Sequence, residues 1–172
     1  MKNLLLLLLI TFCISNFVYS QIGVETQIGG ANFMGVTVNS RFNIPLDDVN
    51  IQKLCPSFGI GMLAPGWDQP TSIINVGLTY HFKNWGIGTE VAGFADNPFR
   101  PSTGPRDFAD MIIYPNLNYT CTFRSNLYLR FSAGLYFAYS KFTNPVSEVT
   151  WLRFEGDLYP GAGISFGYMF NQ

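Results

Sequence analysis

Residues 127–140 read LYLRFSAGLYFAYS, and their side chains divide by odd and even position. The odd-numbered face is apolar or aromatic throughout and consists of Leu127, Leu129, Phe131, Ala133, Leu135, Phe137 and Tyr139. The even-numbered face is small or polar apart from Tyr128 and Tyr136. Because alternate side chains of a strand point to opposite faces, the stretch predicts a β-strand with one continuous apolar face. Tilted by ~45°, a strand of ~14 residues rises about 30 Å, the thickness of a bilayer's hydrocarbon core, which indicates a transmembrane β-barrel.

The composition of the whole chain agrees with this prediction. Charged residues make up 12% of the 172 residues, about half the ~25% of an ordinary soluble domain. The 17 glycines and 10 prolines favour many turns over long helices. The formal net charge of −1 provides no basic surface of the kind that binds nucleic acid, so no nucleic-acid partner is expected.

The N-terminus has the features of a secretory signal. Lys2 precedes a leucine-rich run at 4–14, and Val18 and Ser20 suit the positions just before a cleavage site. We therefore expect residues 1–20 to be a cleaved signal peptide.

The remaining residues, 21–172, are expected to form one outer-membrane β-barrel domain. An N-terminal membrane anchor is the main alternative for the leader, but its apolar run is short beside the ~20 residues that a span needs. A lipoprotein cut at Cys13 would have the bulky Phe12 before the cut, which disfavours it.

Eight segments with a period of two follow the leader, and eight is the smallest strand number common in outer-membrane barrels. They are predicted at 22–29, 33–44, 49–63, 72–82, 85–93, 110–123, 127–140 and 158–170. The predicted fold is all-β, an eight-stranded antiparallel up-and-down transmembrane β-barrel. Pro56 removes a ladder hydrogen bond, so we expect a bulge or a local break in the third strand. Cys55 and Cys121 fall on non-neighbouring strands with opposite facing, which predicts free thiols.

One face of the predicted strands excludes charge. A charge that faces hydrocarbon at mid-depth costs about 2–4 kcal/mol, so the apolar face is the lipid side and the other face lines the lumen. We expect a polar network in the lumen whose members pair with one another, made of Glu25, Arg41, Lys53, His81, Glu90 and Arg130. Together with Tyr114, Tyr128, Tyr136 and Tyr159 it should fill an eight-stranded interior and leave no open pore. A transport path is the alternative reading of the same charges.

Short and long connections alternate along the chain. The short connections are at 45–48, 83–84 and 124–126, and the long ones are at 64–71, 94–109 and 141–157. Outer-membrane barrels have short periplasmic turns and long external loops, so both mature termini are predicted in the periplasm. The connection GGAN at 29–32 breaks this pattern, because it should be external and yet is short.

Three segments carry a resemblance to a known family: the leader end VYSQ (18–21), VNSRFNIPLDDVNIQ (38–52) and GAGISFGYMF (161–170). With them the chain resembles the small eight-stranded outer-membrane barrels of the OmpA/OmpX type, and in particular the outer-membrane β-barrel family of Bacteroidota. The resemblance implies that the last strand is recognised by the barrel-assembly machinery through its alternate aromatic residues Phe166, Tyr168 and Phe170. Two further residues, 171–172, follow the aromatic at which the family usually ends.

His81 is the only histidine, and it decides whether an enzyme is expected. A lipid A deacylase and a palmitoyltransferase of similar barrel size use a histidine with a serine and an acid near the outer rim. The register instead places His81 beside the periplasmic turn at 83–84. We therefore expect a lumen histidine and no enzyme, with an outer-membrane lipid-modifying enzyme as the alternative.

Two further function classes are weighed against the same pattern. A soluble lipocalin-like binder should be apolar inside and charged outside, whereas the strands predicted here are polar inside and apolar outside. Asp96, Asp107 and Asp110 match no calcium-loop spacing, so neither a metal nor a cofactor is expected.

Residues 141–157 read KFTNPVSEVTWLRFEGD and hold the candidate binding loop, Trp151, Leu152, Arg153 and Phe154. Exposed aromatic residues beside charge are typical of binding surfaces. Residues 149–158 also alternate enough to extend strands above the membrane, where a strand edge can accept a partner strand. The alternative is a loop folded over the barrel mouth with Trp151 buried. We predict a structural or surface-interaction role, with outer-membrane lipid and an unidentified extracellular molecule as partners.

Overall fold

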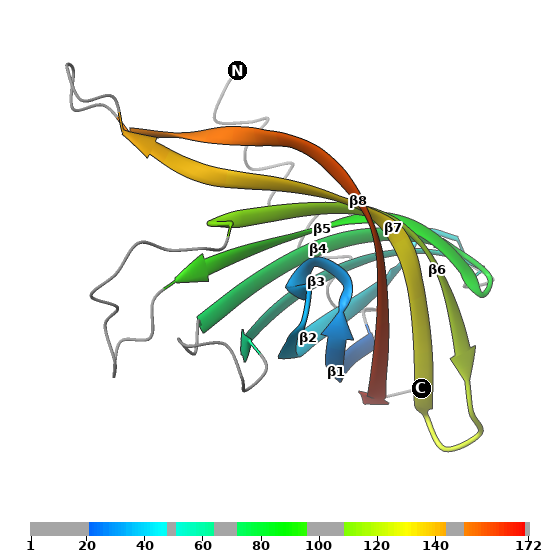
Figure 1. The fold of residues 1–172 in the computed structure, drawn as a ribbon. Helices are drawn as coiled ribbons and strands as arrows, with labels where there is room; N and C mark the ends of the chain where they lie inside the picture. Colours follow the sequence, from blue (N-terminus) through cyan, green and yellow to red (C-terminus); the bar gives the residue numbers. More distant parts are fainter. Residues whose placement is uncertain (1–20, 48–50, 64–71, 96–108, 144–149, 171–172) are drawn as a thin grey trace, which may run out of the picture.

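The computed structural model describes residues 21–47, 51–63, 72–95, 109–143 and 150–170, so the expected signal peptide lies outside the described residues. Eight antiparallel strands pair in chain order, and β1 pairs with β8 to close a barrel (Figure 1). The strands are β1 (Gln21–Gly29), β2 (Gly35–Pro45), β3 (Gln52–Leu63), β4 (Ser72–Phe82), β5 (Trp85–Ala95), β6 (Met111–Thr122), β7 (Leu127–Thr143) and β8 (Thr150–Phe170). The predicted all-β, eight-stranded up-and-down barrel is confirmed.

The two ends of the barrel differ in what they carry. The turn end carries Gln21, Phe170 and the short turns after β4 and β6. The loop end, opposite to it, carries a short 3-10 helix, η1 (Gly30–Asn32), between β1 and β2. In the part of the chain that the structure describes, no helix has the length and apolarity needed to cross a membrane.

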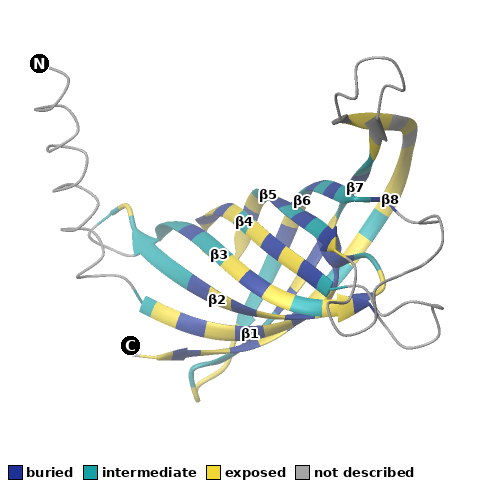
Figure 2. Ribbon diagram, turned by 90° about the vertical axis from the view of Figure 1, so that its left-hand side faces the viewer, coloured by how far each residue is buried: buried dark blue, intermediate teal, exposed yellow. Residues whose placement is uncertain are grey.

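Side chains alternate between the two faces of the wall as the sequence predicts. In β4, Ile74, Val76 and Leu78 are exposed on the outside, whereas Asn75 and Thr79 are buried inside. Figure 2 shows the same alternation of buried and exposed residues along β2, β3 and β5. The outer wall is therefore apolar and the inner wall is largely polar, the reverse of a soluble barrel with an apolar interior.

Pro56 lies inside β3 without a bulge. The pairing of β3 with β4 runs through Pro56 in one register. The pairing with β2 is interrupted between Arg41↔Ser57 and Ile44↔Leu54 and resumes without a shift. The expected local break is confirmed and the bulge is not, because the missing proline N–H removes one hydrogen bond without adding a residue.

β7 and β8 continue beyond the other strands as a hairpin that projects from the loop end (Figure 1). The ladder extends from Tyr139↔Phe154 to Thr143↔Thr150, so the prediction of a loop over all of 141–157 is wrong. The predicted extension of strands through 149–158 is confirmed for residues 150–158, and residues 144–149 lie outside the described part. The register shifts where the hairpin leaves the barrel, since residues 155–157 lie opposite Ala138 alone. A bulge of this kind bends a ladder, and the ribbon turns away from the barrel wall at this level.

Candidate functional site

A buried ion-pair network crosses the middle of the lumen. Arg130 on β7 places Nη2 2.7 Å from Glu25 Oε1 on β1, and Nη1 2.9 Å from Glu90 Oε1 on β5. All three side chains are buried, and a buried charge is tolerated only when it is paired and hydrogen-bonded. The network therefore ties three strands together across the interior.

The remaining oxygens of the two carboxylates are also engaged. Glu25 Oε2 accepts from the Tyr128 hydroxyl at 2.9 Å and lies 3.7 Å from Arg41 Nη1. Glu90 Oε2 accepts from Gln27 Nε2 at 2.7 Å. These contacts extend the network to β2 and leave little acceptor capacity on either acid.

His81 is held by an arginine. Arg41 Nη2 lies 2.6 Å from His81 Nε2. A guanidinium only donates, so Nε2 is the acceptor and Nδ1 carries the ring proton. The lone pair that a general base would use is therefore taken by Arg41, and His81 lies at the turn end, as the register predicts.

The structure brings five of the six predicted lumen residues into one network: Glu25, Arg41, His81, Glu90 and Arg130. Lys53 also faces inward but is half-buried at the turn end, beside the network and not within it. Tyr114, Tyr128 and Tyr136 are buried in the lumen as predicted. Tyr159 lies opposite Tyr136 in the ladder but is 53% exposed, so its predicted place in the filled lumen is wrong, because β8 has no pairing with β1 beyond Gly163.

The connection between β1 and β2 folds into the barrel. All three residues of η1 are buried, and Figure 1 shows this helix inside the ring of strands. Asn32 donates to Thr37 Oγ1 at 2.8 Å and accepts from Asn75 Nδ2 at 2.7 Å. Gly29 and Gly30 have φ of 74° and 61°, a conformation that glycine adopts without strain. The segment that was expected as a short external loop is therefore an internal plug.

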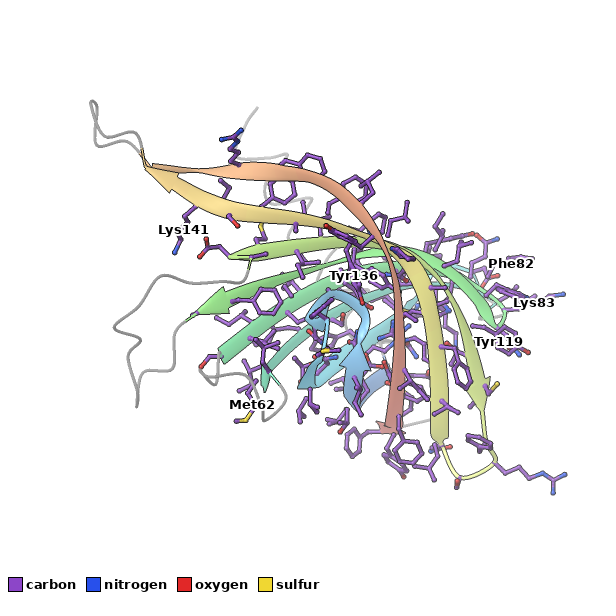
Figure 3. All side chains as sticks on the ribbon, in the orientation of Figure 1. Met62, Phe82, Lys83, Tyr119, Tyr136 and Lys141 are labelled. Carbon is purple, nitrogen blue, oxygen red and sulfur yellow. The ribbon has the colours of Figure 1, made fainter. Side chains whose placement is uncertain are left out.

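An apolar layer packs against this plug at the loop end. Its buried members are Ala31, Leu63, Ile73, Ala92, Phe94, Ala109, Ile112, Tyr114 and Tyr136. Phe33 meets Tyr136 edge-on with ring centroids 5.8 Å apart, and Figure 3 shows Tyr136 beside the plug. This layer was not predicted, because the lumen was expected to be filled by charged residues and tyrosines alone; the apolar Ile73 and Phe94 at inward positions were the available signal.

The predicted binding residues lie on the projecting hairpin. Leu152 is 43% exposed, and Phe154 is exposed while its ring packs near Tyr139 at a centroid distance of 5.4 Å. Arg153 lies opposite Ser140 in the ladder between β7 and β8. Trp151 is a strand residue of β8, and its side chain lies outside what the structure describes. Its role in the binding loop therefore stays a prediction.

The base of the hairpin is fastened to β6. The Lys141 backbone N–H donates to Asp110 Oδ2 at 2.6 Å, and Lys141 Nζ lies 3.8 Å from Asp110 Oδ1. Beyond this point, within the part of the chain that the structure describes, β8 has β7 as its one strand neighbour from 150 to 160, because its pairing with β1 ends at Gly29↔Gly163. The hairpin therefore presents a long strand edge outside the barrel.

Comparisons with models of protein families, with curated proteins and with solved structures returned no match. Over the five described ranges, no group of three or more His, Cys, Asp or Glu side chains could hold a metal ion. Cys55 is buried, Cys121 is half-buried, and both are free thiols, as predicted.

Proposed function

We propose that the chain is an integral outer-membrane β-barrel protein with a closed lumen, and that its role is binding through the β7–β8 hairpin. The observation that carries the binding role is the strand edge of β8, which runs beyond every other strand except β7. An exposed edge offers backbone donors and acceptors to an extended segment of a partner, and alternate side chains add specificity.

The outer wall supports the membrane location. Large apolar side chains are exposed on every strand, among them Ile22, Val38, Ile60, Leu78, Ile87, Leu117, Phe131 and Phe166. Soluble monomers rarely expose contiguous apolar patches larger than a few hundred square ångströms. An apolar outer wall of this extent is stable when it is in contact with lipid.

The aromatic residues at the turn end support the same proposal. Phe82, Trp85 and Phe123 are exposed there, and Trp85 meets Tyr119 edge-on with ring centroids 4.9 Å apart. Figure 3 shows Phe82 and Tyr119 gathered at this end. Barrels carry such aromatic girdles at the membrane interface. The turn end, with both described chain ends, would then face the periplasm, and the exposed aromatic residues of β8 would be available to the barrel-assembly machinery.

The interior supports a role other than transport or catalysis. The plug and the apolar layer around it fill the loop end of the lumen, and the ion-pair network fills its middle. The His81 Nε2 is engaged by Arg41, which favours binding over a histidine-dependent lipid-modifying reaction.

The membrane location is tested by cell fractionation with a heat-modifiability gel. We expect the protein in the outer-membrane fraction, with a mobility that changes on boiling. A protein found in the soluble periplasm, with the same mobility before and after boiling, would end the proposal. Binding is tested by comparing the full chain with a variant that lacks the projecting hairpin.

A further inference from the structure

A small cavity opens at the turn end of the barrel, below the ion-pair network. Its volume is about 80 Å³, several times the roughly 10–15 Å³ that one water molecule needs. Its polar lining includes Arg41, Asn43, Lys53, His81, Thr120 and Tyr128. The cavity is therefore large enough for a group of several heavy atoms and polar enough to hold one.

The charge around this cavity is one-sided. Arg41 and Lys53 line it, and no carboxylate does so among the residues that the structure describes. The nearest acid to Arg41 is Glu25, at 3.7 Å, and that carboxylate is held more closely by Arg130 at 2.7 Å. Lys83 lies at the rim with its ammonium 5.7 Å from the Phe82 ring centroid. Arg41 and Arg130 together balance Glu25 and Glu90, so the surplus positive charge at the cavity is that of Lys53 and Lys83.

Two donors in the cavity wall have a weak partner or none. Thr120 Oγ1 is buried and, within the described residues, has no hydrogen-bond partner. Asn43 Nδ2 has Met169 Sδ as its acceptor at 3.8 Å, and a thioether is a weak acceptor. A buried polar group without a partner costs free energy, so an acceptor in the cavity would stabilise this wall.

Arg41 has capacity for such an acceptor. Its guanidinium carries five N–H donors, and the contacts described for it are one imidazole nitrogen and one distant carboxylate oxygen. Guanidinium and ammonium groups together are the usual ligands of phosphate and carboxylate groups. A partly enclosed cleft of one sign also concentrates counter-ions.

We propose that the turn-end cavity binds a small oxyanion, a phosphate or carboxylate group that enters from the solvent or from a lipid headgroup at that end. Arg41 and Lys53 supply the charge, and Asn43 and Thr120 supply neutral donors. The site differs from the hairpin in place and in chemistry, and it stands independently of the binding role of the hairpin.

The test uses the full mature chain in phosphate-free maltoside micelles, with inorganic phosphate as the probe. Amide resonances of Asn43, Lys53 and Thr120 are followed by NMR as phosphate is added. We expect shifts that saturate and that sodium chloride at equal ionic strength does not produce. Shifts that grow linearly, or that chloride reproduces, would overturn the proposal.

Matched variants test the charges. Lys53→Gln should weaken the apparent affinity at least about tenfold, because it removes a charge-assisted contact. Lys53→Arg should keep the affinity within about threefold, because the charge remains. Lys141→Gln, at the loop end, should leave it unchanged. Equal affinity of the wild type and Lys53→Gln would overturn the proposal.

A second arm separates the two sources of the anion. The same micelles are doped with phosphatidic acid, and with diacylglycerol as the uncharged control. Saturating shifts with inorganic phosphate alone identify a free anion as the ligand, and shifts with phosphatidic acid alone identify a headgroup. If neither probe moves the three resonances, no oxyanion site exists in the cavity.

Discussion

Arg130 donates to Glu25 across the lumen at 2.7 Å, although β7 and β1 are separated in the barrel wall by β8. The pair therefore links strands that share no backbone hydrogen bonds. Arg130 also holds Glu90 from the opposite side, so one guanidinium pairs with both buried acids, and Arg41 beside Glu25 supplies the second positive charge. The interior of this barrel is organised around Arg130.

Replacing Arg130 with methionine should strongly destabilise the barrel. Arg130→Met leaves Glu25 and Glu90 buried without their main partner, which typically costs about 3–5 kcal/mol of unfolding free energy. Urea unfolding of the refolded protein in micelles measures the loss. Arg130→Met combined with Glu25→Gln and Glu90→Gln should recover part of it, because both acids are then neutral and Arg41 is the one charge of the network that remains. Lys141→Met, which removes an exposed pair, should cost at most about 1 kcal/mol.

The plug is predicted to depend on Gly29. A Cβ at this position would lie 2.4 Å from the backbone oxygen of Ala162, and its φ of 74° disfavours a side chain. Gly29→Val should therefore lower the unfolding free energy by at least about 1–3 kcal/mol, measured in the same urea assay. Gly93→Val is the control, because a Cβ there has nothing within 4 Å. Equal stability of the two variants would contradict the packing described for the plug.

The number of strands, and which of their side chains face outward or inward, could be predicted from the sequence because period-two patterns are local. Ile74 and Asn75 are assigned to opposite faces by their neighbours alone. The pairing of Glu25 with Arg130 could not be predicted, since the two residues are 105 positions apart and meet only when the barrel closes. The period-two pattern assigns both side chains to the lumen face but carries no information on the distance between them.

The plug could not be predicted from the sequence, and the hairpin could be predicted only in part. The segment at 29–32 is too short to show a pattern, and its inward course depends on the space left by small residues such as Gly163. The alternation at 149–158 predicts strands that extend above the membrane, whereas residues 141–143 of β7 were assigned to the loop. Above the rim, charge and strand structure are compatible, so the charge marks the end of the apolar wall and not the end of the strand.

The filled lumen predicts negligible conductance. An eight-stranded barrel is just wide enough to be filled by side chains, and Arg130, Tyr114 and the buried η1 occupy this one. We expect no large, stable single-channel current from the wild type in planar bilayers, with a sixteen-stranded porin as the positive control. A large and stable current would contradict the closed interior.

The outer wall predicts a position-specific penalty for charge. Phe131 is 46% exposed on the outside, whereas its neighbour Ser132 is buried inside. Phe131→Arg should cost about 2–4 kcal/mol in a lipid bilayer and impair assembly, because it places charge at mid-depth. A spin label at Phe131→Cys should be accessible to oxygen dissolved in lipid, and one at Ser132→Cys should not. Normal assembly of Phe131→Arg, with residue 131 shielded from lipid, would contradict the proposed orientation.

Deleting the projecting β7–β8 hairpin should abolish the proposed binding. In the first variant, a short Gly-Ser turn replaces residues 140–153 and connects Tyr139 to Phe154. These two residues already lie opposite each other in the ladder. The barrel below keeps its strand pairs, so this variant should assemble and shift normally on a heat-modifiability gel. It should nevertheless lose the binding phenotype that a deletion strain reveals, because the long edge of β8 is gone.

Two further variants decide between binding and catalysis in that assay. Leu152→Ser with Phe154→Ser keeps the strand edge and removes its exposed apolar side chains, and should give an intermediate loss if both contribute. His81→Ala removes the imidazole held by Arg41 at the opposite end of the barrel, and should leave the phenotype unchanged. If His81→Ala abolishes the activity while the hairpin deletion assembles and retains it, binding through the hairpin is wrong and a histidine-dependent reaction takes its place.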